Sequence, residues 1–246
     1  MRFSLDAVQA QILSFDGVSR RYRRAHAALH AGDTRTARAL HAEMSSRARS
    51  AAHRRLVTEI DVWCSLCEAD LERARAAFIG ASSPSDLLRA TMGAALGSDA
   101  GAVDVLADAL EDVPALLLVT RALVGAGRAA VVPRVLARPG MPIRFADPTL
   151  HAATEALFRS GALAECEEAC LLASKAFGAP THHYNAACCA SRLGDVDRAL
   201  RHLATAIAGG FAAREQLASD VDLATVRADP RFADLLNEKP PIVKNG

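Results

Sequence analysis

The chain has 246 residues, of which 51% are hydrophobic, 4% aromatic and 23% charged, and its formal net charge is +1. Ala and Leu supply most of the hydrophobic content, so the composition excludes a disordered or fibrous protein and favours a helix-rich globular one. A net charge this close to zero argues against a protein that binds nucleic acid or anionic lipid by overall attraction.

The first segment, MRFSLDAVQAQILSF, lacks the features of a secretory signal, because Asp6, Gln9 and Gln11 interrupt its apolar run. Further along, Arg121 interrupts the most apolar stretch, VPALLLVTRALVGAG, so we expect no membrane span. Without an export signal we expect a cytoplasmic protein whose six cysteines are reduced thiols.

Arginine is concentrated near the start of the chain. Residues 1–60 hold eleven Arg and no Lys against five acidic residues, and the densest stretch is SRRYRRAHAALH, with Arg20, Arg21, Arg23 and Arg24. The plainer interpretation is a solvated helix face. The alternative is a basic surface that docks on an acidic protein or on a nucleic-acid backbone.

Helical hairpins are predicted all along the chain. Six segments share the pattern of an apolar helix, a break and a second helix, with the turn at Gly32, Ala69, Gly97, Gly127, Gly161 and Gly194. Glycine can adopt the left-handed conformation that ends a helix, and an aspartate such as Asp195 can cap the amides of the next helix. Replacing a glycine in that conformation by a β-branched residue would cost about 1–2 kcal/mol.

The clearest hairpin is HHYNAACCASRLGDVDRALRHLATAIAGGF, and the turns at 127, 161 and 194 are 34 and 33 residues apart. Apolar residues follow Gly194 with helical spacing at Ala199, Leu200, Leu203, Ala206 and Ile207. In this period and in these small residues, the chain resembles tetratricopeptide repeat proteins, in which two antiparallel helices form each repeat.

The resemblance implies an all-α fold, a right-handed superhelix (α-solenoid) of about six hairpins in a single domain over residues 1–237, with divergent repeats before residue 80. In the family, small residues occupy the closest approaches of paired helices, which here implies Ala187, Ala199 and Ala206. Two interruptions are expected: a longer loop over 136–150, which has three prolines and a glycine, and a shortened helix at Pro133.

The C-terminal segment over 209–237 resembles the closing element of bacterial repeat arrays, with Gly-Gly-Phe, Asp-x-Asp-Leu and Asp-Pro-Arg-Phe in order. A solenoid needs such a cap because its last repeat has an unpaired apolar face. We expect that face to be covered by Phe211, Leu217, Leu223, Phe232, Leu235 and Leu236. Residues 238–246 are expected to form a flexible tail.

Cysteine and histidine raise the question of metal or thiol chemistry. Cys64 and Cys67 lie in a plain helical pattern without a second ligand pair, so we expect them to be packing residues. The C-terminal cysteines, at 166, 170, 188 and 189 beside His182 and His183, fit packing positions too, and a metal or thiol site there is the weaker alternative. The sequence has no phosphate loop, zinc helix, nucleophile elbow or dinucleotide motif, so we expect no catalysis, metal or cofactor.

In the family, the first helices of successive repeats line a concave groove that contacts the ligand. The resemblance therefore implies a partner-binding groove formed by Tyr22, His26, Glu59, Trp63, Arg121, His151, Glu155, Arg159, Tyr184, Cys188 and Arg192. Residues four apart share one helix face, and such polar and aromatic stripes suit the capture of a peptide or helix. For Trp63, a place in the core is an equal alternative. These positions lack the Lys and Asn with which a subset of the family holds acidic chaperone C-termini, so that ligand is not expected.

The leading hypothesis is a noncatalytic protein–protein interaction module that acts as an adaptor, assembly factor or inhibitor. The alternative is a nucleic-acid-binding or regulatory protein that uses the Arg-rich N-terminal helices. The sequence leaves the oligomeric state open.

Overall fold

The computed structural model describes residues 17–97, 101–110 and 113–237, and within these ranges it is all-helical. The elements are α2 (Gly17–Ala31), α3 (Thr34–Ser45), α4 (Ala51–Cys67), α5 (Leu71–Ile79), α6 (Asp86–Leu96), α7 (Ala102–Ala109), α8 (Val113–Gly125), α9 (Val131–Leu136), α10 (Met141–Arg144), α11 (Asp147–Arg159), α12 (Leu163–Phe177), α13 (Pro180–Arg192), α14 (Val196–Ala208), α15 (Arg214–Ser219), the 3-10 helix η1 (Val221–Leu223), α16 (Ala224–Arg227) and α17 (Pro230–Asn237). The predicted tail, 238–246, lies outside the described residues.

Left-handed turns join the paired helices at the predicted positions. The backbone φ is positive at Gly32, Gly97, Gly127, Gly161 and Gly194, and also at Ala69, where φ is 62°. After three of these turns an aspartate accepts a hydrogen bond from a backbone amide of the next helix: Asp33 caps α3, Asp70 caps α5 and Asp195 caps α14. The turn and cap chemistry read from the sequence is therefore confirmed.

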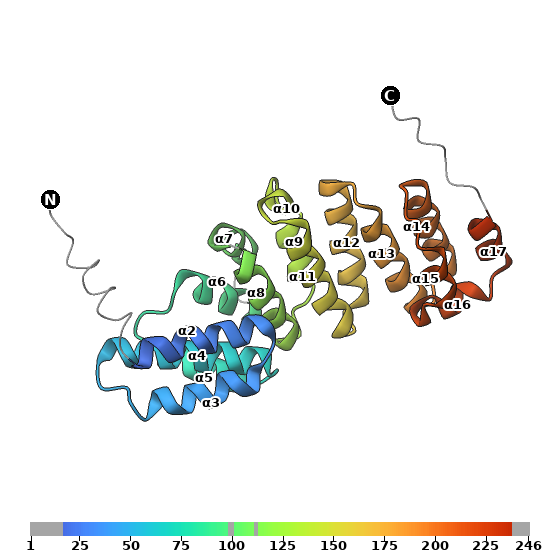
Figure 1. Ribbon diagram of the computed structural model, residues 1–246. Coiled ribbons are helices and arrows are strands. Elements are labelled where there is room, and N and C mark those ends of the chain that lie inside the picture. The colour runs from blue at the N-terminus through green and yellow to red at the C-terminus, as the bar shows by residue number, and fades with distance from the viewer. Residues whose placement is uncertain (1–16, 98–100, 111–112, 238–246) are drawn as a thin grey trace, which may run out of the picture. The chain divides into compact units, whose positions relative to one another are not determined.

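The chain divides into two compact units (Figure 1). Unit 1 runs to Arg128 and contains α2 to α8, and unit 2 begins at Ala129 and contains α9 to α17. The single domain over 1–237 stays a prediction, and each unit is described by itself below.

Unit 1 has a core of large buried side chains contributed by α2, α3, α4, α6 and α8. They include Leu29, Met44, Ile60, Trp63, Leu66, Leu88, Met92, Leu116, Leu118 and Leu123. Gly125 lies where α8 passes the end of α4, and a Cβ atom there would stand only 1.9 Å from the carbonyl oxygen of Leu66. Only glycine allows the two backbones to approach this closely.

Arginine side chains also tie the helices of unit 1 together. Arg38 on α3 makes ion pairs with Asp61 and Glu68, the second at 2.7 Å, and donates to the Ser65 hydroxyl at 2.8 Å. Arg121 on α8 donates to the carbonyl oxygens of Leu29 and His30 in the last turn of α2.

Unit 2 contains the most regular helix pairs. Helices α11 to α14 lie side by side in chain order (Figure 1), and Ala187, Ala199 and Ala206 are fully buried between α13 and α14. The predicted cap closes this end: Leu217, Leu223, Val226 and Phe232 are buried against α13 and α14, while Phe211, Leu235 and Leu236 pack on them partly buried. The apolar face of the last hairpin is thus covered as expected.

The segment around the predicted loop differs from expectation. Helix α9 has six residues and contains Pro133 in its first turn, as a shortened helix should. The stretch 136–150, however, is not a long loop. Gly140, with φ of 79°, reverses the chain into the short helix α10, and α11 begins at Asp147 with a proline in its first turn. Pro142 and Pro148 lie in the first turns of α10 and α11, because proline fits the first turn, where no amide partner is needed.

Among the described residues, no helix is both long and apolar enough to cross a membrane.

Candidate binding site

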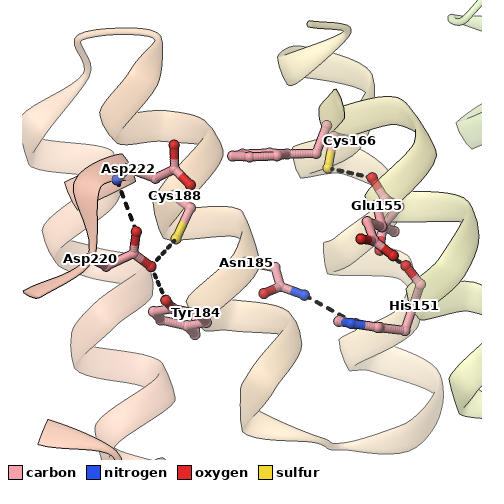
Figure 2. Close-up of a pocket in the computed structure, with 10 residues that line it drawn as sticks. His151, Glu155, Cys166, Tyr184, Asn185, Cys188, Asp220 and Asp222 are labelled. Atoms are coloured by element: carbon pink, nitrogen blue, oxygen red, sulfur yellow. Dashed lines mark hydrogen bonds between the residues drawn. The ribbon is translucent and has the colours of Figure 1, made fainter. Parts of the chain in front are cut away.

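A pocket of about 200 Å³ opens in unit 2 between α11, α13 and the turn that leads into η1 (Figure 2). Its lining comprises His151, Thr154, Glu155, Phe158, Cys166, Tyr184, Asn185, Cys188, Asp220 and Asp222. Four of these residues, on two successive first helices, belong to the predicted groove: His151 and Glu155 on α11, and Tyr184 and Cys188 on α13.

The α11 wall presents exposed side chains one helical turn apart. His151 and Glu155 are both exposed, and Glu155 pairs with the exposed Arg159 at 2.5 Å along the same helix. Asn185 of α13 lies across from His151, with its amide nitrogen 3.4 Å from the His151 Nδ1 atom. A partner entering the pocket would therefore meet a carboxylate, an imidazole and an amide near the surface.

The floor on the α13 side is built around the Asp220 carboxylate. The Tyr184 hydroxyl donates to Asp220 Oδ2 and accepts from Gln216 Nε2 at 3.1 Å. The other oxygen, Asp220 Oδ1, accepts from the backbone amide of Asp222 at 2.9 Å and so caps η1. The Tyr184 ring stacks on Phe211 with its centroid 4.6 Å away. These contacts lock Tyr184 between the pocket and the cap.

Cys188 lies beside this network, with its sulfur 3.9 Å from Asp220 Oδ2. Burial, reinforced by the Asp220 carboxylate, raises the pKa of the Cys188 thiol well above its ordinary value. Burial first, and the hydrogen bond to Asp220 second, raise the pKa of Tyr184. Both groups stay protonated near pH 7, so they act as hydrogen-bond donors and not as nucleophiles.

Asp222 is a partly buried carboxylate of the pocket that lies near a second one. Partial burial and the nearby Asp220 raise its pKa, and Arg192, the cation that opposes this, stands 3.8 Å away. The Arg192 guanidinium also lies over the Phe158 ring, 4.9 Å from its centroid. With Glu155, Asp220 and Asp222 on its walls, the pocket offers more acceptors than donors.

The other C-terminal cysteines are packing residues of unit 2. Cys166, Cys170 and Cys189 are buried free thiols, and Cys166 donates to the Thr154 carbonyl oxygen at 3.2 Å. Hydrogen bonds with Cys170 and Cys189, together with burial, raise the pKa of Cys166. Such thiols are poor nucleophiles. Among the side chains that the structure describes, no three His, Cys, Asp or Glu residues are grouped as ligands for one metal ion.

The two histidines that open α13 also have structural partners. His182 is 2% exposed, and its Nε2 atom lies 2.5 Å from Asp147 Oδ1 at the start of α11. His183 stacks at a tilt near His202, and burial lowers the pKa of His183. These contacts join neighbouring helix starts and leave neither ring in the pocket.

The predicted groove residues of unit 1 fall into two groups. Tyr22 and His26 form a stripe of partly buried rings on α2 that continues to His30, with neighbouring centroids 5.6 and 4.9 Å apart. The others face inward. Trp63 is 1% exposed in the core, the buried Glu59 carboxylate accepts from Ser85 Oγ at 2.8 Å, and Arg121 holds the end of α2. We leave these three out of the candidate site.

No protein-family model matches this chain, and no curated protein or solved structure matches it.

Sequence reasoning missed several lining residues of the pocket, above all Asp220 and Asp222. Both were visible in the Asp-x-Asp-Leu motif of the cap, but that motif was assigned only to closing the fold. Thr154, Phe158, Cys166 and Asn185 were missed as well, since they lie one or more positions off the predicted stripes. Of the predicted residues, Arg159 and Arg192 flank the pocket as exposed partners of Glu155 and Asp222.

Proposed function

We propose that the protein is a noncatalytic interaction module, a repeat fold similar to tetratricopeptide proteins, that binds a segment of a partner protein across α11 and α13. The observation that carries the proposal is the pocket itself: stripes on two successive first helices, four residues apart in each, line one concave site. A site of this size fits one side chain of a bound segment, with the exposed stripe positions contacting its neighbours.

The chemistry of the lining favours a partner that donates hydrogen bonds. The carboxylates of Glu155, Asp220 and Asp222 accept hydrogen bonds, and the pKa of Asp222 is raised first by partial burial and second by repulsion from Asp220. A lysine, an arginine or a free amino terminus entering from the partner would relieve that repulsion. The protonated thiol and phenol are suited to shaping the site and not to a reaction.

The test is selection of peptides from a random library on the immobilised full-length chain, followed by affinity measurements on the selected peptides. We expect peptides with a basic residue, whose affinity falls roughly tenfold when Glu155→Gln and Asp222→Asn are combined, since each exposed or partly exposed ion pair contributes up to about 1 kcal/mol. The matched control is Glu168→Gln, an exposed carboxylate of α12 outside the pocket lining.

Selected peptides that bind the double variant and the wild type equally would remove the pocket as the binding site. Selection of peptides without any basic residue would contradict the proposed chemistry. A melting temperature of each variant that is no lower than that of the wild type shows that a lost affinity does not come from unfolding.

A further inference from the structure

A strongly basic surface lies at one end of unit 1, on the N-terminal half of α2, the end of α3 and the start of α4. Residues 17–60 contain ten arginines, no lysine and three acidic residues. Of the three, Glu59 is buried and Asp33 caps α3 at the other end of that helix. Among the described residues 17–60, the basic end, which we define by Arg21, Arg24, Arg47, Arg49, Arg54 and Arg55, therefore holds six cations around one carboxylate, Glu43.

The contacts draw these guanidinium groups together. Arg21 Nε pairs with Glu43 Oε2 at 2.6 Å and so ties α2 to the end of α3. The hydrogen bond with Arg21 comes first among the causes that lower the pKa of Glu43, and the nearby charges of Arg21, Arg47 and Arg24 add to it. Arg54 Nη1 reaches the carbonyl oxygen of Arg49 at 3.3 Å. Several like charges are thus held close together, an arrangement that a polyanion would relieve.

A groove lined by rings adjoins the basic end. It is formed by Tyr22, Arg23, His26, Ala27, His30, Leu87 and Ala115, with a volume of about 430 Å³. The rings of Tyr22, His26 and His30 follow one another along α2, and His26 Nδ1 lies 3.0 Å from His30 Nε2. Arg55 is close enough to influence Tyr22, whose pKa it lowers against the larger effects of burial and Glu59. Arg23, which neighbours Arg24 in the chain, belongs to the lining of the groove, so cations border the rings.

We propose that this surface binds single-stranded nucleic acid, with the basic end on the phosphates and the ring-lined groove on one or two bases. Guanidinium groups match phosphate oxygens in a forked geometry, which makes arginine the usual residue for backbone contacts. Flat rings next to a basic track provide the stacking surface that unpaired bases use. An acidic peptide would satisfy the cations but would leave the ring-lined groove unexplained. The inference does not depend on the pocket of unit 2.

The experiment is a fluorescence-anisotropy titration of the full-length chain with a labelled single strand of about 12 nucleotides, a length within the site sizes of single-strand binders. The same strand in a duplex and polyglutamate serve as competitors, and the titration starts at about 50 mM salt. We expect the single strand to bind, and the duplex and polyglutamate to compete poorly.

Two sets of variants test separately how much the arginine charges and the aromatic rings contribute to binding. Changing the exposed Arg24, Arg47 and Arg54 to Gln should weaken binding roughly tenfold or more, and should make the slope of log affinity against log salt shallower by about 2, at about 0.7 per phosphate contact. The control changes three exposed arginines of unit 2, Arg134, Arg144 and Arg201, to Gln and should leave both quantities unchanged.

Glu43→Gln removes the single carboxylate of the basic end and should act in the opposite direction, with tighter binding and a steeper slope. His26→Ala with His30→Ala should weaken single-strand binding roughly tenfold with an unchanged slope, since stacking is not a counterion effect. If the variant with both His26→Ala and His30→Ala fails to fold, the arginine and Glu43 variants alone test whether the surface binds single-stranded nucleic acid.

The proposal is overturned if no strand binds at low salt, if the two triple variants lose the same affinity, or if polyglutamate or the duplex competes as well as the single strand does.

Discussion

The two units use the same hairpin rule but hold their helices together by different means. In unit 2, buried alanines let α13 and α14 approach closely, and an apolar cap covers the end of the hairpin. In unit 1, partly buried arginines reach across helices, as Arg38 does from α3 to α4 and Arg121 from α8 to the end of α2. The turn chemistry therefore fixes the hairpin, whereas the residues between helices determine how each unit is stabilised.

The charges of the two units also have different surroundings. Unit 1 gathers cations at one end, around Glu43, while unit 2 gathers carboxylates on the walls of a pocket. If both proposals hold, one chain would bring a nucleic acid and a basic protein segment together. Four predictions test the contrast between the units, from the largest expected effect to the smallest.

Gly125, at the close backbone contact between α8 and α4, should be the position of unit 1 that tolerates substitution least. Gly125→Ala places a Cβ atom 1.9 Å from the Leu66 carbonyl oxygen, so α8 must shift away from α4. We expect a loss of about 3 kcal/mol in the free energy of unfolding, measured by chemical denaturation. Gly80→Ala, where the nearest atom would be 3.5 Å away and φ is −77°, is the control and should change stability by less than about 1 kcal/mol. Equal effects of the two changes would show that the contact is not tight.

Removing an arginine side chain should lower the free energy of unfolding more in unit 1 than in unit 2. Arg38→Met removes a side chain that is 19% exposed and serves two carboxylates and a hydroxyl, and we expect a cost of about 2 kcal/mol. Arg159→Met removes an exposed pair within one helix and should cost less than about 0.5 kcal/mol. Similar losses in denaturation midpoint for both variants would contradict the contrast between the units.

The link between the pocket and the cap of unit 2 depends on one hydroxyl. Tyr184→Phe keeps the ring on Phe211 but leaves Asp220 Oδ2 without its phenol donor. We expect a loss of about 1 kcal/mol in the free energy of unfolding. Tyr22 is a partly buried phenol, more exposed than the buried Tyr184, so Tyr22→Phe is a comparison from unit 1. A loss near zero in Tyr184→Phe would mean that the cap is held by its apolar contacts alone.

Asp222 should reduce stability at neutral pH. Its pKa is raised in the folded state, so the stability that its protonated form provides is present below the unfolded pKa and is lost as pH rises through the folded pKa. Asp222→Asn should therefore stabilise the protein by less than about 1 kcal/mol at pH 7 and have no such effect at pH 3. The measurement is the melting temperature of Asp222→Asn and of the wild type at pH 7 and at pH 3. Equal stabilisation at both pH values would show that the charge of Asp222 does not cause it.

Local sequence signals were enough for the hairpins and the cap. Gly194 with Asp195 specifies a turn and a helix start within a few residues, and the apolar residues of 209–237 have only one exposed hairpin face beside them to cover. The helices within residues 136–150 were harder to predict, because proline both breaks and starts helices. Its local effect depends on the preceding turn, which Gly140 supplies.

Only part of the candidate site could be predicted from the sequence, because local patterns do not show which distant segments pack together. A stripe such as His151 and Glu155 identifies a face of one helix, but the sequence does not say which distant segment will cover that face. In unit 1, Ser85 covers Glu59, and the packed core encloses Trp63. In unit 2, the cap returns to α13 and adds Asp220 and Asp222 to the pocket. Contacts between segments far apart in the chain therefore determine which predicted residues of unit 1 are buried and which residues line the pocket of unit 2.

Ala69 has a consequence for recognising repeats of this kind. It adopts a φ of 62° without being glycine, and its turn keeps the same backbone hydrogen bonds as the turn at Gly194: the amide of residue 69 to residue 66, and of residue 70 to residue 65. The surrounding helices therefore impose the turn even on a residue that disfavours it. A helical hairpin can thus form its left-handed turn without glycine, and backbone conformation is a better guide than glycine spacing for counting hairpins in a chain of this kind.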